Sequence, residues 1–93
     1  MLDELLILKK IKGGDIKAFE ELFRRYYFPL CCYAAGITGQ MEVAEEIVEE
    51  LFYVLWKERE RLQIFQSVKS YLYRATRNQS LQYCEHEEVR NRY

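Results

Sequence analysis

The 93-residue sequence contains little proline or glycine, and this scarcity limits the folds it can form. It has one proline and four glycines, the residues that most often interrupt helices and make tight turns between strands. So few interruptions favour a small number of long helices over many short strands. Apolar runs are also short, and none approaches the roughly 20 residues that a membrane-spanning helix requires. The sequence therefore predicts one small helical domain without membrane insertion.

The number and spacing of the cysteines and the single histidine argue against a disulfide framework, a zinc site and an active site. Three cysteines, of which Cys31 and Cys32 are adjacent, do not make an even disulfide framework, so we expect reduced thiols and a cytoplasmic protein. A zinc site that adds Cys84 and His86 is conceivable, but adjacent cysteines lack the usual ligand spacing. Small buried thiols are the simpler interpretation. One histidine and no phosphate-binding loop indicate neither an enzyme nor a bound cofactor.

Apolar residues recur at helical spacing, which predicts an all-α fold, a compact bundle of three to four helices. The predicted helices cover about residues 2–12, 16–35, 41–60 and 67–84. Gly13 and Gly14 end the first helix, and Asp15 is a suitable N-cap for the second. Pro29 removes a backbone hydrogen bond inside the second, so we expect a kink or a break near residues 26–28.

The third predicted helix concentrates negative charge. Five glutamates fall within residues 42–50, with no lysine or arginine among them. At about 100° per residue the glutamates and Tyr53 share one arc, with Trp56 at its border. The opposite arc is an apolar stripe that we expect to be core, formed by Ala44, Ile47, Val48, Leu51 and Leu55.

Two interpretations of this charge remain open. The helix dipole favours acids in the first turn, which accounts for Glu42 and partly for Glu45 but not for Glu49 or Glu50. Exposed glutamates are also common on solvated helix faces. The functional interpretation is a docking surface for a basic partner, flanked by aromatic anchors.

The fourth predicted helix carries the opposite charge, since residues 67–84 hold three bases and no acid. Lys69, Tyr73 and Arg77 are spaced i, i+4, i+8, which predicts a stripe on the outer face. Cations there suit phosphates and a ring suits a base, and Phe65 before the helix extends the platform. An ordinary amphipathic helix with solvated arginines is the alternative. The residues expected to face inward are Val68, Tyr71, Leu72 and Ala75.

Taken together, these segments resemble region 2 of bacterial RNA polymerase sigma factors of the extracytoplasmic-function type. The resemblance covers about residues 5–84 and rests on "KGGDIKAFEELFRRYY", "ITG…VAEEIVEELFYVLW" and "SVKSYLYRATRN" in that order. It implies a helical bundle that docks on core RNA polymerase and recognises and melts the promoter −10 element. A helix-turn-helix domain normally follows in this family, so we expect residues 1–93 to be a single region 2-like domain from a longer protein.

The resemblance also implies partners for the two charged helices. The acidic helix would bind the clamp helices of the polymerase's largest subunit through Glu45, Glu46, Glu49, Glu50, Tyr53 and Trp56. The connector and the next helix would capture the non-template strand of the −10 element through Gln63, Ile64, Phe65, Gln66, Ser67, Lys69, Tyr73, Arg74, Arg77 and Asn78. An anti-sigma factor is a further expected partner.

The sequence departs from the family pattern at several positions, and two of these departures add negative charge. Glu49 stands where the family usually has glutamine, which makes the docking surface more acidic. Glu85, Glu87 and Glu88 stand where a basic run commonly grips duplex phosphates, and these acids would repel DNA. The alternative function is a helical adaptor that binds a basic protein through its acidic helix and never contacts DNA.

Overall fold

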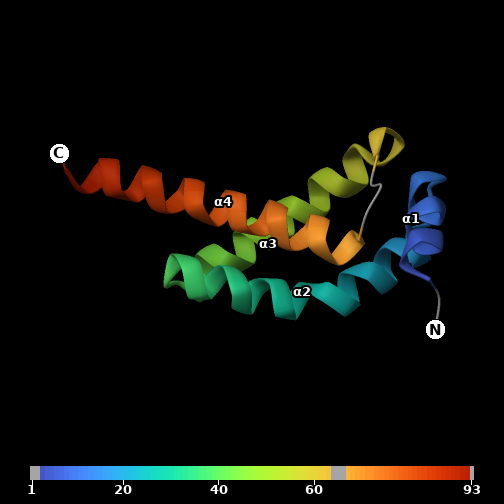
Figure 1. Cartoon of the computed structure of the whole chain (residues 1–93), viewed down its shortest axis with the longest axis horizontal. Coiled ribbons are helices and arrows are strands. Elements are labelled where there is room, and N and C mark those ends of the chain that lie inside the picture. The colour runs from blue at the N-terminus through green and yellow to red at the C-terminus, as the bar shows by residue number, and fades with distance from the viewer. Residues whose placement is uncertain (1–2, 64–66, 93) are drawn as a thin grey trace.

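In the computed structural model of the chain, residues 3–63 and 67–92 are described, and they form four α-helices and no strand (Figure 1). The helices are α1 (Glu4–Lys12), α2 (Ile16–Thr38), α3 (Met41–Lys57) and α4 (Val68–Asn91), and a short 3-10 turn, η1 (Arg59–Arg61), follows α3. Figure 1 shows α2, α3 and α4 packed along one another, with α1 across one end of the bundle. The all-α fold class is confirmed. No helix of the described ranges is long and apolar enough to cross a membrane.

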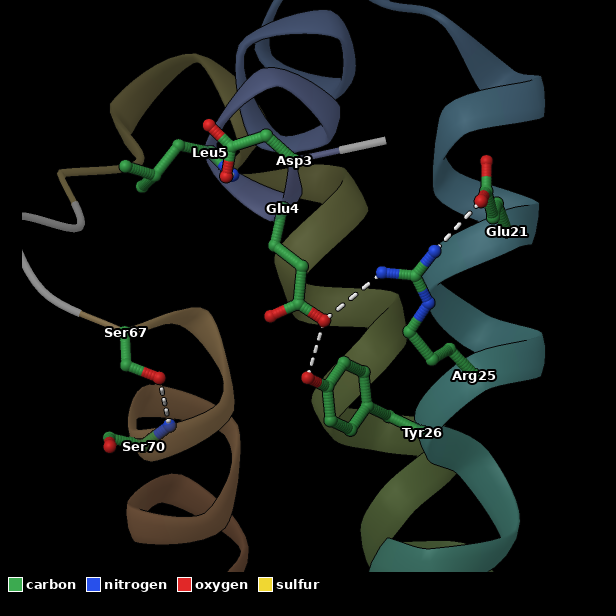
Figure 2. Close-up of polar contacts among 8 residues, drawn as sticks. All are labelled: Asp3, Glu4, Leu5, Glu21, Arg25, Tyr26, Ser67 and Ser70. Carbon is green, nitrogen blue, oxygen red and sulfur yellow. Dashed lines mark hydrogen bonds and ion pairs between the residues drawn. The ribbon is translucent and has the colours of Figure 1, made fainter. Parts of the chain in front are cut away.

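Local sequence signals fix several helix ends. The Asp15 carboxylate accepts hydrogen bonds from the backbone N–H groups two and three residues later, at 3.0 and 3.2 Å. Asp3 and Ser67 cap α1 and α4 with one such bond each, at 3.3 and 3.2 Å (Figure 2). Gly39 ends α2 with a positive φ of 77°, which glycine adopts without a Cβ clash. The caps predicted at Asp15 and Ser67 are confirmed, because capping depends on neighbouring residues alone.

Of the kink or break expected near residues 26–28, the break does not occur, since α2 continues through Pro29 to Thr38. Proline removes one intrahelical hydrogen bond, but buried residues on both sides hold the helix against the bundle. Tyr26 and Leu30 are 8% and 0% exposed. Burial of these side chains outweighs the local cost at proline.

All four helices contribute to the core, and its composition corrects the predicted apolar stripe of α3. Ile47 and Leu51 are half-buried. Phe52, which was not assigned to the stripe, is 1% exposed and packs edge-on against the Phe23 ring at 5.0 Å. The aromatic clustering available from α2 decides which side of α3 is buried most deeply. The fully buried aliphatic side chains of the core include Ile7, Ile11, Leu22, Leu30, Val48, Val68 and Leu72.

The inner face of α4 also differs from the prediction. Val68 and Leu72 are buried as expected, whereas Tyr71 is 39% exposed. The buried stripe continues instead through Thr76 and Ser80, and the Ser80 hydroxyl donates to the carbonyl of Thr76 at 2.8 Å. The Ser80 hydroxyl thus satisfies itself on its own helix, whereas the buried Thr76 hydroxyl has no hydrogen-bond partner among the described residues. Polar residues therefore occupy positions that hydropathy assigns to the surface.

Candidate functional site

The five glutamates of residues 42–50 form an acidic face on α3. Glu42, Glu46, Glu49 and Glu50 are exposed and Glu45 is half-buried. Across residues 3–63 and 67–92, none of the five forms an ion pair, although other acids of the domain do. The face therefore carries negative charge that the described part of the bundle does not neutralise by direct contact.

The two aromatic residues beside the acidic face differ in accessibility. Tyr53 is 58% exposed, with the Lys57 ammonium 5.9 Å from its ring centre. Trp56 is half-buried, because its ring packs against Phe19 at 5.1 Å and the Arg59 guanidinium lies 4.3 Å from its centre. The Tyr53 ring is thus accessible to a partner, whereas most of the Trp56 ring is in contact with residues of this domain.

Behind the acidic face, α2 places Tyr27 and Cys31. Burial raises the pKa of Tyr27 to about 12, with Cys31 and then the carboxylates of Glu49 and Glu45 adding to the rise. Burial also raises the pKa of the Cys31 thiol, which keeps it in the unreactive neutral form.

The three cysteines do not share one environment. Cys31 is buried as predicted, but Cys32 is exposed and Cys84 is half-buried. The interpretation of all three as small buried thiols is therefore wrong for Cys32, which lies on the solvent side of α2. Within the described ranges, no group of three or more histidine, cysteine, aspartate or glutamate side chains is arranged to hold a metal ion.

The first half of α4 presents a basic face formed by Lys69, Arg74 and Arg77. All three are exposed, and Asn78 beside them is exposed too. In the part of the chain that the structure describes, none of the three cations has an ion-pair partner. Their charge is available to an anionic ligand.

Tyr73 does not stand outward with these cations, contrary to the prediction. It is half-buried, and its ring meets Tyr33 of α2 edge-on, with centroids 5.1 Å apart. Spacing of i, i+4, i+8 aligns residues along a helix, but the position of α2 decides that the middle one is covered. An aromatic ring gains more from this packing than from exposure to water.

The predicted DNA-capturing connector is described only at its ends. Gln63 and Ser67 are exposed, and the Ser67 hydroxyl accepts from the Ser70 N–H as the α4 cap. The predicted contacts at Ile64, Phe65 and Gln66 lie outside the described residues. The start of the connector is tied to α1, because the Lys12 ammonium donates to the Leu62 carbonyl at 3.0 Å.

A groove between α3 and α4 lies beside the acidic face and was missed by the sequence reasoning. Its walls combine carboxylates with apolar and amide side chains from two helices, so helical periodicity within either helix does not reveal it. The signal available in the sequence was Val54, an apolar residue outside the predicted stripe, and the structure shows its side chain to be 43% exposed. Such a groove suits a helix that carries both basic and apolar groups. Its lining residues are Glu46, Ile47, Glu50, Leu51, Val54, Tyr71, Ala75 and Gln79.

The acidic C-terminal stretch is part of α4, which continues to Asn91 and projects beyond the rest of the bundle (Figure 1). Glu87 pairs with Arg90 at 3.2 Å, and Glu88 pairs with Arg92 at 2.9 Å. Two of the acids expected to repel DNA are therefore locally neutralised, and they engage the two arginines nearest to them.

Comparison with known proteins agrees with this geometry. A similar solved structure is the NMR structure of an engineered region 2 of sigmaE in complex with GTAAAA, which has a TM-score of 0.79, 21% identity and coverage of 96% of this chain and 93% of that chain. At this identity the likeness concerns the fold. A search of curated protein sequences gave no match. The family described as Sigma-70 region 2 matches residues 22–88. The chain therefore belongs to the sigma-70 region 2 family, whose domains bind core RNA polymerase and recognise the promoter −10 element.

Proposed function

We propose that the acidic face of α3 docks on the basic clamp helices of the largest polymerase subunit, while the connector and the basic face of α4 hold the melted non-template strand of the −10 element. The observation that carries this proposal is the pair of oppositely charged faces on consecutive helices, each without ion-pair partners in the described residues. One bundle can thus bind a cationic protein and an anionic strand at the same time.

Docking through the acidic face follows from electrostatics. Carboxylates four residues apart on α3 repel one another, and a basic partner converts this repulsion into attraction. Tyr53 supplies an exposed aromatic contact at the end of the face, and Val54 supplies an apolar one in the groove next to Glu50. Charge then governs the rate of encounter, and the aromatic and apolar contacts govern the lifetime of the complex.

Strand capture through α4 uses its cations and its polar side chains. Lys69, Arg74 and Arg77 are placed to meet phosphates, and Asn78 offers amide donors and acceptors to a base edge. Tyr73 acts through its packing on Tyr33, which holds the helix in position, rather than by stacking on a base. Unstacking DNA costs about a few kcal/mol per step, and contacts to the exposed strand offset this cost without any catalytic step.

Family membership favours this function over an adaptor that never contacts DNA, because sigma-70 region 2 domains recognise the −10 element. The basic face of α4 would also be unexplained in such an adaptor. An anti-sigma factor for this domain would have to cover the acidic face or the basic face. Either choice would block one of the two proposed contacts.

The DNA contact is tested by titrating the domain with the single strand GTAAAA at low salt. We expect Lys69→Ala with Arg77→Ala to weaken binding, and to reduce the slope of log K against log salt by about 0.7 for each lost phosphate contact. The matched control is Lys10→Ala with Lys17→Ala, which removes two exposed positive charges from other helices. Equal losses in both double variants, or no loss in either, would show that the basic face of α4 does not hold the strand.

A further inference from the structure

A pocket lies between α1 and the start of the connector, outside both charged faces. Leucines of α1 and Leu62 supply its apolar lining, and Asp3, Lys9, Lys12 and Gln63 supply its polar lining. Gln63 is also the first residue of the segment proposed to hold single-stranded DNA. The pocket is therefore continuous with the proposed strand-binding surface.

The apolar lining is more exposed than a helix of this small domain requires. Leu5 and Leu6 are 46% and 42% exposed, and both line the pocket. The same helix buries Ile7 and Ile11 fully against the bundle, so the two leucines are not needed to anchor α1. Adjacent exposed leucines beside a hollow indicate a contact surface.

The charges around the pocket are net positive. Glu4 does not neutralise them, because its carboxylate is held by the Tyr26 hydroxyl at 2.5 Å and by Arg25 at 3.2 Å (Figure 2). Lys9 forms no ion pair in the described ranges of the chain. Lys12 uses one of its three N–H groups on the Leu62 carbonyl, which leaves two for another acceptor.

Asp3, the one acid in the lining, already accepts a hydrogen bond within α1. The Asp3 carboxylate accepts the Leu5 backbone N–H at 3.3 Å as the cap of α1. Because the lining contains two lysines and one carboxylate, its net charge is positive and attracts an anion. Lys10 lies on the same helix but does not line the pocket. It therefore serves as a control for Lys9, with the same charge outside the pocket.

We propose that this pocket binds one further nucleotide of the strand that the connector holds, an inference that rests on the proposed function. The base lies on Leu5 and Leu6, and its phosphate pairs with Lys9 and Lys12. Gln63 contributes an amide to the base edge. A nucleotide joins a ring with apolar faces to an anionic phosphate, and the pocket likewise places exposed leucines beside lysines. Because Lys12 also holds the Leu62 carbonyl, occupancy of the pocket fixes the start of the connector.

The test compares GTAAAA with the same strand extended by three thymidines at its 5′ end or at its 3′ end. We expect one of the two extensions to raise affinity by roughly three- to tenfold, the gain from one added base contact and phosphate contact. Lys9→Ala and Leu5→Asn should each remove this gain and leave affinity for GTAAAA unchanged. Lys10→Ala, with the same loss of charge on the same helix, should retain the gain.

Three results would overturn the proposal. The first is GTAAAA binding with no gain from either extension, and the second is an equal effect of Lys9→Ala and Lys10→Ala, which would indicate general electrostatics. The third is loss of polymerase binding instead of strand affinity in Lys9→Ala, since the pocket would then hold a protein segment. Failure of the proposed function has another signature, namely affinity for GTAAAA that does not respond to Lys69→Ala with Arg77→Ala.

Discussion

Glutamates at the contact between α1 and α2 and glutamates on the acidic face of α3 share one chemistry but differ in their surroundings. Arg25 lies between Glu4 and Glu21, with charged atoms 3.2 and 2.9 Å apart, and the Tyr26 hydroxyl completes the cluster (Figure 2). The acidic face has no such cation in the described structure. Glu4 links α1 to α2 through Arg25 and Tyr26, whereas the unpaired glutamates of α3 leave charge for a partner.

Charge reversal on the acidic face should give the largest effect. We expect Glu46→Lys with Glu50→Lys to weaken binding of the domain to core RNA polymerase on the order of 100-fold, because like charges then face each other across the contact. Fluorescence anisotropy of the labelled domain at several salt concentrations measures this change. The loss should shrink as salt screens the interaction.

The matched control places the same two reversals elsewhere. Glu20→Lys with Glu85→Lys changes net charge equally at exposed residues of α2 and α4 that lack ion pairs in the described part of the chain. This variant should bind polymerase nearly as the parent does. A comparable loss would attribute binding to net charge, and unchanged binding of both variants would refute docking through α3.

An intermediate effect is expected at the paired glutamates, this time on stability. Tyr26→Phe removes the hydroxyl that donates to Glu4, and we expect the free energy of unfolding to fall by about 1 to 2 kcal/mol in urea titrations at pH 7. Polymerase affinity of the folded fraction should not change. A fall in affinity without a fall in stability would contradict the division between the two sets of glutamates.

The pH dependence of that variant has a defined sign. Burial, followed by the hydrogen bond to Glu4, raises the pKa of Tyr26 from 10.0 to about 12 in the folded protein. The neutral phenol therefore adds stability that is complete below pH 10 and is lost as the pH rises toward 12. The stability difference between the parent and Tyr26→Phe should narrow over that interval. Tyr27→Phe should show the same narrowing, because burial raises the pKa of Tyr27 to about 12 as well.

The smallest effect is a difference in stability change between removing an unpaired glutamate and removing a paired one. Glu49→Gln removes like-charge pairs with Glu45 and Glu46, so the isolated domain should gain roughly 0.2 to 0.5 kcal/mol. Glu88→Gln breaks an ion pair with Arg92 at 2.9 Å and should bring no gain. Thermal unfolding of both variants at low salt measures the difference, and an equal shift in both would remove the distinction.

Much of the helical architecture could be predicted because its causes are local. The periodic apolar residues, the carboxylate of Asp15 and the hydroxyl of Ser67 act within a few residues of the chain, and the structure confirms these caps. The absence of a break at Pro29 has the opposite origin. The cost of the proline is local, but the burial that outweighs it comes from other helices.

The candidate site likewise has features that local sequence predicts and features that depend on packing between helices. The charge of the acidic face and of Lys69 and Arg77 follows from composition and spacing, and the structure places these side chains at the surface. Whether an aromatic ring is open or covered depends on which helix lies beside it. Tyr73 packs on Tyr33 and Trp56 on Phe19, from α2 in both cases.

The sequence by itself determined that this chain forms helices, where most of them begin, and that two consecutive helices carry opposite charge, because propensity, capping and formal charge are properties of short segments. The tertiary structure decided which of those charges find partners and which rings are covered. It also created the groove between α3 and α4 and the pocket between α1 and the connector. Each of these depends on residues that lie far apart in the chain and meet only when the helices pack.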